Sequence, residues 1–303
     1  MIQVHTISDL SLPELAPYRT MRMQREHRLQ RIFVAEGEKV VRRLLESPLK
    51  VVSVLLPPNW FQELESVLEQ RPDHIHVYLA EKPLLESLTG FSMYQGLLAV
   101  GQIPAPLALE DAYSMAASPR LLAAVDGLSS AENLGSLVRN CVAFRAQALV
   151  VGETCSSPYL RRAVRSSMGT VFQLPIVETS SLVKALASLR ARGTRIVGAH
   201  PHTEERSLSQ ARFEDDCCVV FGSEGFGISD PILEACDEVV AIPMPPTVDS
   251  LNVASAAAVF LYEVSRQRTQ ASNKCPSEAK MSAQSATKFT TVSSAASGNT
   301  PRL

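Results

Sequence analysis

Short apolar runs alternate with segments of helical length through the second half of the chain, from Pro119 to Arg266. The apolar runs cover residues 121–125, 148–151, 172–176, 195–199, 217–221 and 239–242. The helical segments cover residues 132–144, 160–168, 181–192, 231–236 and 254–266. Strands that are apolar throughout are buried on both faces, and strands that alternate with helices pair in parallel. The pattern therefore predicts an α/β domain over residues 119–268, a parallel sheet with helices on both faces.

A smaller α/β unit is predicted over residues 1–103. Apolar runs at 51–56, 76–79 and 97–100 indicate strands, residues 60–69 and 82–88 indicate helices, and residues 15–47 are helical except for an interruption at 32–37. Prolines at 104 and 106 favour a linker, which we place at 104–118. Residues 269–303 are rich in Ser, Thr and Ala, so we expect a disordered tail there.

Basic residues are concentrated near the N-terminus. Between Arg19 and Lys50, Lys and Arg outnumber Asp and Glu, whereas the whole chain has a net charge of −2. Either this is a solvated helix surface or it contacts phosphates, and the local excess favours phosphate contact. The predicted RNA-binding side chains are Arg19, Arg22, Arg25, Arg28, Arg31 and Lys39. The basic helix at 160–168, with Arg161, Arg162 and Arg165, has the same two interpretations.

Cysteine usage and the N-terminus favour a cytoplasmic protein. The six cysteines form no C-x-x-C pair, which is typical of reduced thiols and not of a zinc site or a disulfide framework. No signal-peptide pattern and no apolar run long enough to cross a bilayer occur in the sequence. We therefore expect neither a metal nor a membrane partner.

A glycine-rich loop follows the predicted strand at 217–221. Gly222, Gly225 and Gly227 let the backbone turn sharply or approach a ligand, and a simple turn is the plain alternative. Glu224 lies among these glycines, so its side chain has no structural role in a hydrophobic core. It is therefore expected to meet a cation in a ligand or partner.

Two further loops follow predicted strands and lead into helices. Asn133 lies near the start of the helix after 121–125, and Arg139 lies beside that helix's buried stripe. A stiff loop with three prolines follows 239–242 and ends at Ser250 and Asn252. The plain alternatives are a helix N-cap at Ser250 or Asn252 and a solvated Arg139. Open α/β sheets bind ligands where a stiff loop joins a strand end to a helix start, so the loop after 239–242 is a candidate ligand site.

Together the three loops resemble the motifs of the SpoU (TrmH-like) branch of the knotted SPOUT methyltransferases, over residues 120–265. The first motif matches Asn133, Gly135, Arg139 and Asn140. The second matches Gly222, Glu224, Gly225 and Gly227, and the third matches Ile242, Pro243, Ser250, Leu251, Asn252 and Val253. The resemblance implies a C-terminal trefoil knot. The segment 31–41 resembles the substrate-binding domain, similar to ribosomal protein L30e, that precedes many SpoU domains.

The resemblance implies transfer of a methyl group from S-adenosylmethionine to a ribose 2′-hydroxyl of rRNA or tRNA, by a homodimer paired through the knotted region. It implies cofactor contacts at Ala199, His200, Gly222, Ile242 and Leu251. It implies catalytic roles for Asn133, Arg139, Glu224, Ser250 and Asn252. Because arginine stays protonated, we interpret Arg139 as a clamp on a substrate phosphate that also stabilises the developing alkoxide.

Two alternative functions make different demands on the sequence. A nicotinamide-dependent enzyme requires G-x-G-x-x-G after the first strand, but only Gly127 and Gly135 follow residues 121–125. A non-catalytic RNA-binding protein on the same fold would tolerate loss of the predicted catalytic residues. All four of those that it would tolerate losing are present, namely Arg139, Glu224, Ser250 and Asn252. The enzyme is therefore the favoured prediction.

Overall fold

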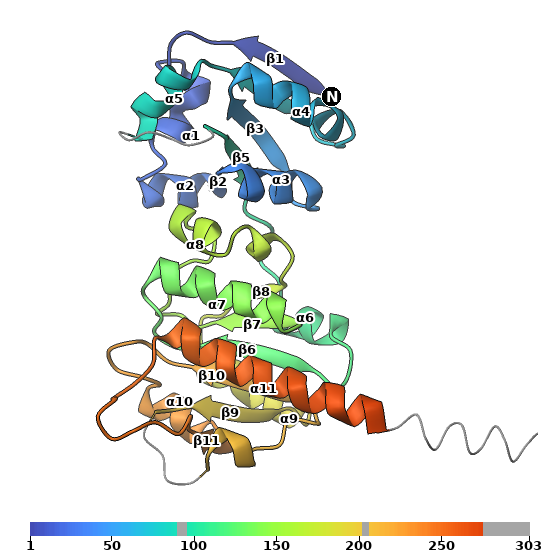
Figure 1. Ribbon diagram of the computed structural model, residues 1–303, viewed down its shortest axis with the longest axis vertical. Coiled ribbons are helices and arrows are strands. Elements are labelled where there is room, and N and C mark those ends of the chain that lie inside the picture. The colour runs from blue at the N-terminus through green and yellow to red at the C-terminus, as the bar shows by residue number, and fades with distance from the viewer. Residues whose placement is uncertain (90–95, 202–205, 275–303) are drawn as a thin grey trace, which may run out of the picture.

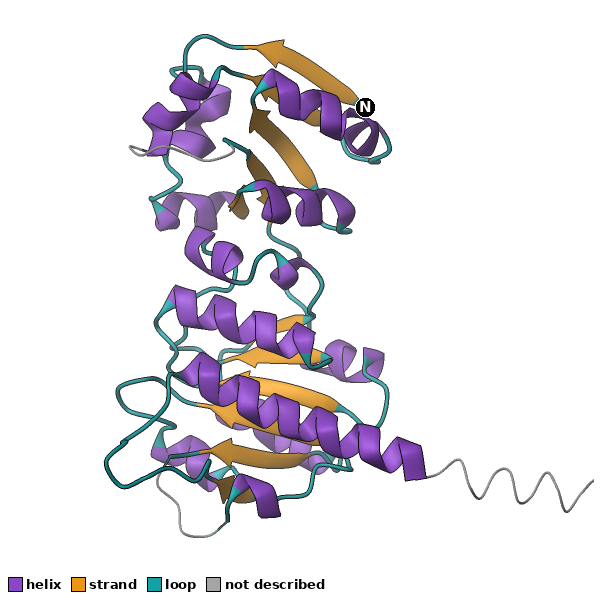
Figure 2. Cartoon of the chain, viewed as in Figure 1, coloured by secondary structure: helices purple, strands orange, loops and turns teal. Residues whose placement is uncertain are grey.

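The chain forms two α/β units, each built around its own sheet (Figure 1). The computed structural model describes residues 1–89, 96–201 and 206–274. The smaller N-terminal unit and the larger C-terminal unit follow each other along the long axis of the molecule, and helices cover the strands in both (Figure 2).

The smaller unit contains a five-stranded mixed sheet of order β1-β4-β3-β5-β2. Its strands are β1 (Ile2–Thr6), β2 (Ile32–Glu36), β3 (Val51–Leu56), β4 (Ile75–Leu79) and β5 (Leu98–Gln102). Its helices are η1 (Pro13–Leu15), α1 (Ala16–Arg19), α2 (Gln24–Gln30), α3 (Glu38–Glu46), α4 (Pro58–Glu69) and α5 (Lys82–Thr89). The three predicted strands are confirmed. The interruption predicted at 32–37 is the strand β2, and β1 is not among the predicted strands.

The larger unit contains a six-stranded, all-parallel sheet of order β11-β9-β10-β6-β7-β8. Its strands are β6 (Leu121–Val125), β7 (Ala148–Val151), β8 (Ile176–Glu178), β9 (Arg195–Ala199), β10 (Cys217–Phe221) and β11 (Glu238–Val240). Its helices are α6 (Leu109–Met115), α7 (Ala131–Ala143), α8 (Arg161–Ser166), η2 (Thr170–Phe172), α9 (Leu182–Ala191), η3 (Leu208–Gln210), α10 (Asp230–Glu234) and α11 (Val253–Lys274). The predicted parallel sheet is confirmed, while the trefoil knot stays a prediction from the family resemblance.

Alternate residues of the parallel strands enter two separate cores. Leu121 and Ala123 of β6 pack in the core that contains residues of α7 and α11. Leu122 and Ala124 pack in the core that contains residues of α6, α9 and α10. Both faces of the sheet are therefore covered, as the uninterrupted apolar runs predict.

The two units pack directly against each other through the α8–η2 segment, residues 161–172. Phe33 of β2 stacks on Phe172 of η2, with ring centroids 5.3 Å apart. Glu36, at the end of β2, is buried and accepts hydrogen bonds from Arg161 and Arg165 of α8. Buried residues of both units form one continuous cluster. The N-terminal sheet is thus anchored on the larger unit.

The packing of α8 and of α6 corrects two expectations. The arginines of the helix predicted at 160–168 are paired within the protein, because Arg161 and Arg165 bind Glu36, and Arg162 binds Glu132 at 3.0 Å. The predicted linker at 104–118 contains α6, whose Ala112 packs in the core of the larger sheet. Local proline content could not reveal this long-range packing.

We expect Glu36→Ala to lower the free energy of unfolding by about 1.5–3 kcal/mol, the contribution typical of hydrogen bonds to a charged group. Its partner Arg161 is 19% exposed and would lose its carboxylate. Urea denaturation measures the loss. Arg165→Ala is the control, because that side chain is 59% exposed and exposed pairs contribute about 0–1 kcal/mol. Equal losses in the two variants would show that Glu36 does not hold the interface.

The last helix is longer than predicted. α11 continues beyond Arg268 to Lys274, so the tail predicted to be disordered from 269 begins with helix, and residues 275–303 lie outside the described residues. Arg268 donates hydrogen bonds to the carbonyl oxygens of Pro119, Arg120 and Phe213 at 2.7–2.9 Å. These contacts fix the helix to the amino-terminal edge of the sheet and favour its continuation.

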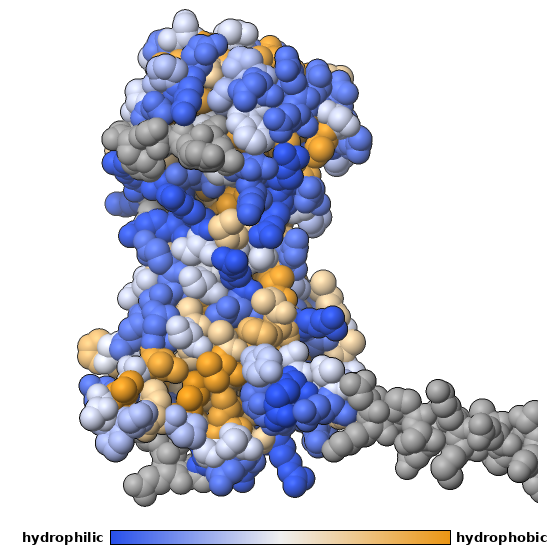
Figure 3. All heavy atoms as spheres, in the orientation of Figure 1, coloured by the Kyte–Doolittle hydropathy of each residue, from blue (hydrophilic) through white to orange (hydrophobic). Residues whose placement is uncertain are grey.

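The surface differs between the two units. In Figure 3 hydrophilic residues cover most of the N-terminal unit, and apolar residues gather on the face of the larger unit along which α11 runs. No helix in the described ranges is both long enough and apolar enough to cross a bilayer.

Candidate functional site

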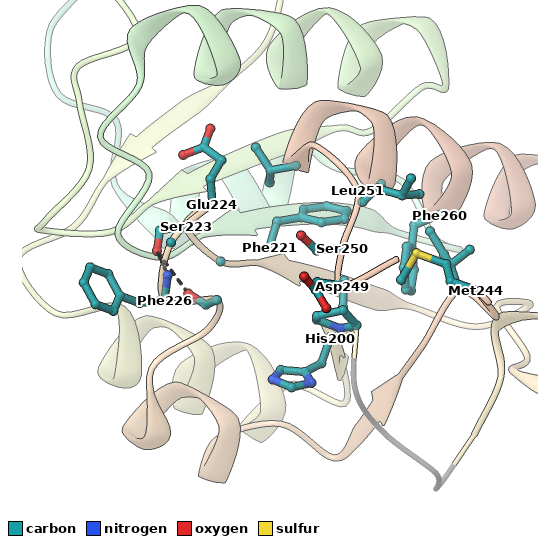
Figure 4. A pocket seen from close by; sticks show the side chains of 18 residues that line it. His200, Phe221, Ser223, Glu224, Phe226, Met244, Asp249, Ser250, Leu251 and Phe260 are labelled. Carbon is teal, nitrogen blue, oxygen red and sulfur yellow. Dashed lines mark hydrogen bonds between the residues drawn. The ribbon is translucent and has the colours of Figure 1, made fainter. Parts of the chain in front are cut away.

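A cavity of about 390 Å³ lies where β9 and β10 end, beside the loop that follows β11. The loops after β10 and β11 supply most of its walls (Figure 4). Phe221 and Phe260 supply apolar lining, and their rings meet edge to face with centroids 6.0 Å apart. Carboxyl ends of parallel strands are the usual ligand sites of open α/β sheets, so this cavity is the candidate site.

Gly222 begins a tight turn directly after β10. A Cβ atom at this position would lie closer than 3.0 Å to backbone atoms of Gly227 and Ile228. The reason is that Ser223 and Gly227 exchange backbone hydrogen bonds of 2.9 and 3.0 Å. Gly227 completes the turn with a φ of 69°. The close approach that Gly222 permits is therefore within its own loop, as the turn alternative predicts.

Side chains from all three predicted motifs form a chain of hydrogen bonds beside the cavity. Asn133 Nδ2 donates to Glu224 Oε1, and Asn252 Nδ2 donates to Asn133 Oδ1 at 3.1 Å. Glu224 also lines the cavity. This amide–carboxylate chain (Asn133, Glu224 and Asn252) joins α7, the loop after β10 and the start of α11, and it holds a carboxylate in one orientation at the site.

Asn252 also begins α11. Its Oδ1 accepts from the backbone N–H groups of Ala254 at 2.9 Å and Ser255 at 3.4 Å, which makes it the N-cap. Asn140 Nδ2 donates to the carbonyl oxygen of Ala254 at 2.6 Å and ties α7 to the same turn. The N-cap alternative is therefore confirmed for Asn252, whose amide nitrogen remains available to the amide–carboxylate chain.

The structure brings most of the predicted catalytic residues together. Glu224 and Ser250 line the cavity, and Asn133 and Asn252 are connected to it through the amide–carboxylate chain. Arg139 does not line the cavity. It is exposed on α7 and has no hydrogen-bond or ion-pair partner among the described residues.

The predicted cofactor residues share one location, because all of them line the cavity. They are Ala199, His200, Gly222, Ile242 and Leu251.

The predicted RNA-binding side chains divide into two groups. Arg19 donates to the carbonyl oxygens of Leu10 and Leu12, and Arg31 donates to that of Pro104. These two arginines thus stabilise the fold of the N-terminal unit. The remaining ones are exposed, namely Arg22, Arg25, Arg28 and Lys39.

Two residues near the cavity are absent from the sequence prediction. Asp126 Oδ2 accepts from the backbone N–H and the hydroxyl of Ser229 at 2.8 and 2.7 Å, which ties the end of β6 to the loop after β10. Its position directly after a buried strand is the signal that could have identified it. Phe226 lines the rim of the cavity and is 98% exposed, which no sequence pattern indicates.

The cavity residues fit S-adenosylmethionine. The volume lies within the range of about 300–1,000 Å³ typical of small-molecule sites. Ile242 and Leu251 offer apolar surfaces suited to an adenine ring, and Glu224 and Asp249 offer carboxylates suited to hydroxyl or ammonium groups. This mixture of apolar walls and few polar groups is typical of a nucleoside-containing ligand.

Comparison with known sequences gives one family. Residues 120–262 match the SpoU rRNA Methylase family. An uncharacterized tRNA/rRNA methyltransferase of Mycobacterium tuberculosis is 32% identical over 239 residues, which cover 78% of this chain and 81% of that protein. A protein of the same description from Mycobacterium leprae is 31% identical, with 78% of this chain and 71% of the relative covered.

Comparison with solved structures gives the same fold. The SpoU methyltransferase AviRb from Streptomyces viridochromogenes in complex with AdoMet has a TM-score of 0.73 and 25% identity, covering 85% of this chain and 98% of AviRb. The AdoMet-bound rRNA methyltransferase from Sinorhizobium meliloti has a TM-score of 0.75 at 20% identity, covering 87% and 98% of the two chains. The sequence match over most of both chains, the cavity lined by residues of the second and third motifs, and the shared fold lead to one conclusion: the chain belongs to the SpoU rRNA methylase family.

Proposed function

We propose that this protein transfers a methyl group from S-adenosylmethionine to a ribose 2′-hydroxyl of tRNA or rRNA. The bond from sulfur to the methyl group breaks as the bond from oxygen to it forms, S-adenosylhomocysteine leaves, and the hydroxyl proton is released to solvent. The amide–carboxylate chain carries the proposal, because it joins residues of all three motifs beside one cavity. Relatives described as tRNA/rRNA methyltransferases support the substrate class, and the AviRb complex with AdoMet supports the cofactor.

The bound cofactor supplies a methyl group already activated by its positive sulfur, so the contribution of the protein is position and charge. Ile242 and Leu251 line the cavity and would offer their apolar side chains to the adenine ring of the cofactor. Ser250 and the amide–carboxylate chain orient the ribose through hydrogen bonds. Holding both reactants in a fixed geometry lowers the entropic part of the barrier.

Arg139 supplies the positive charge. Its guanidinium carries five N–H donors, and no described residue occupies them. It binds a phosphate of the RNA in a forked geometry and stabilises the negative charge that develops on the reacting oxygen.

Mass mapping tests the reaction. RNA from cells that lack the gene is incubated with the protein and S-adenosylmethionine carrying a labelled methyl group. We expect a labelled 2′-O-methyl nucleoside in tRNA or rRNA. Label on a base, or no transfer to any RNA, would contradict the proposal. Calorimetry with S-adenosylhomocysteine and with NAD separates it from the nicotinamide alternative.

We further propose that the N-terminal unit, residues 1–103, binds RNA through the exposed basic residues of α2. Arg25 and Arg28 are exposed and unpaired among the described residues. The anchoring of this unit on the α8–η2 segment would hold the bound RNA at a constant distance from the cavity.

We expect charge reversal at Arg25 and Arg28 to weaken RNA binding and to flatten its salt dependence. Each lost contact to single-stranded RNA should reduce the slope of log K against log salt by about 0.7, because fewer counterions are released. Fluorescence anisotropy with an oligouridine at several salt concentrations measures the slope. Arg212→Glu, at an exposed arginine of the larger unit, is the control. An unaltered slope would leave these arginines as a solvated surface.

A homodimer through α7 and α11 is the proposed assembly. Val259 and Tyr262 are 40% and 55% exposed on α11, and the ring of Tyr262 lies edge to face against Phe144, with centroids 6.1 Å apart. Exposed apolar side chains on one helix are typical of an interface. A second copy seated there would also lie beside the exposed side of α7, which carries Arg139.

We expect the double substitution Val259→Glu and Tyr262→Glu to convert the dimer into a monomer in light scattering, because two carboxylates would be buried without partners. Val183→Glu is the matched control, since Val183 is 39% exposed on α9, on the opposite face of the sheet. A monomeric parent protein, or a dimer in the double variant, would refute the interface.

A further inference from the structure

Phe226 is displayed to solvent at the rim of the cavity. Its side chain is 98% exposed, whereas the other described phenylalanines are buried or half-buried. In Figure 4 its ring lies on the outer side of the turn that also carries Glu224, away from the interior of the cavity. A core role for this ring is therefore excluded.

The turn that displays Phe226 is well ordered by hydrogen bonds. Its backbone N–H donates to the hydroxyl oxygen of Ser223 at 3.2 Å, inside the paired backbone bonds between Ser223 and Gly227. The carboxylate of Asp126 also fixes the chain just after the turn, because it accepts two hydrogen bonds from Ser229. The ring is thus presented at a defined position, two residues from the carboxylate of the amide–carboxylate chain.

We propose that Phe226 is a stacking platform for an unpaired base of the RNA next to the methylated nucleotide. This inference rests on the proposed function and adds a substrate-positioning residue to it. Single-stranded RNA is recognised by unstacked bases that lie on aromatic side chains. The ring lies on the same loop as Glu224, so a base stacked on it would lie next to the ribose that enters the cavity.

The surroundings of Phe226 favour a base over a protein partner. Its neighbours in the turn are Ser223, Glu224, Gly225 and Gly227, and none of these adds apolar surface. Protein interfaces have contiguous apolar cores, whereas base stacking needs only one ring with open faces. Apart from chain neighbours, a Cβ at Gly225 or at Gly227 would have no atom within 4 Å, so the turn borders open space on both sides of Phe226.

Enzyme kinetics with bulk RNA from cells that lack the gene provide the first test. We expect Phe226→Ala to raise KM for RNA about 5- to 150-fold, the loss typical of one base stack. Affinity for S-adenosylhomocysteine should stay unchanged. Phe226→Tyr keeps a ring and should stay close to the parent, while Phe226→Leu keeps apolar surface without a ring and should resemble Phe226→Ala. Equal KM values for the Leu variant and the parent would overturn the proposal.

A fluorescence experiment tests stacking without activity. Trp60 is the single tryptophan of the chain, so Phe226→Trp in a Trp60→Phe background gives one indole at the turn. We expect oligouridine to quench its emission. If the tryptophan variant binds oligouridine but its emission is not quenched, the proposal is overturned. The proposal is also overturned if the parent is a dimer and the Phe226→Ala variant is a monomer, because the ring would then belong to a protein interface. Failure of the parent to methylate any RNA would instead refute the proposed function.

Discussion

Arg139→Ala should lower the turnover number for methyl transfer about 100- to 1,000-fold, the loss typical when a donor to a developing oxyanion is removed. Cofactor affinity should stay within a few-fold of the parent, because Arg139 does not line the cavity. Single-turnover transfer of a labelled methyl group, together with calorimetry using S-adenosylhomocysteine, separates the two quantities.

Two controls define what Arg139 contributes. Arg139→Lys keeps the charge but loses the forked geometry, so its rate should fall between those of the parent and the alanine variant. Arg212→Ala removes an exposed arginine elsewhere on the larger unit and should have the parent rate. Turnover of Arg139→Ala within a few-fold of the parent would remove Arg139 from the mechanism.

Gly222→Val should abolish detectable cofactor binding. A Cβ at this position would approach the backbone of Gly227 and Ile228 far closer than Cβ atoms are ever found, so the turn would have to open. Opening the turn moves Glu224 away from Asn133 and removes one wall of the cavity. Calorimetry with S-adenosylhomocysteine measures the loss.

Gly225 offers a matched control for Gly222. A Cβ there meets no atom within 4 Å, and its φ is not in the left-handed region. Gly225→Ala should therefore retain most of the cofactor affinity. Similar affinities in Gly222→Val and the parent would show that the cavity is not the cofactor site.

Buried strands were the most predictable part of the fold. β6, β7, β9 and β10 begin and end at the predicted residues, because each is an apolar run with turn-forming residues at its ends. The prediction of a strand over the whole run at 172–176 was wrong. Phe172 ends the 3-10 helix η2 and stacks on Phe33 of the other unit, so the strand β8 starts only at Ile176. A contact between residues so far apart in the chain leaves no local pattern.

The residues of the site were predictable from its motifs, but the hydrogen bonds between those residues were not. The resemblance selected residues that line the cavity, since glycine and proline patterns after strands survive as local features. The hydrogen bond between Asn133 and Asn252 joins residues that are far apart in the sequence of the larger unit. It follows only from the way α7 and α11 pack. The pairing of Glu36 with Arg161 is of the same kind and changes the interpretation of a basic helix.

The order of the elements along the chain has a consequence for synthesis on the ribosome. All strands of the N-terminal sheet precede residue 103, and the segment on which it rests follows at 161–172. The cavity needs residues from Ala199 to Phe260, near the end of translation. Since domains generally fold as they emerge, we expect the nascent chain to acquire a folded N-terminal unit well before it acquires a place for its cofactor. A polypeptide released early would therefore contain the unit proposed to bind RNA without the means to modify that RNA.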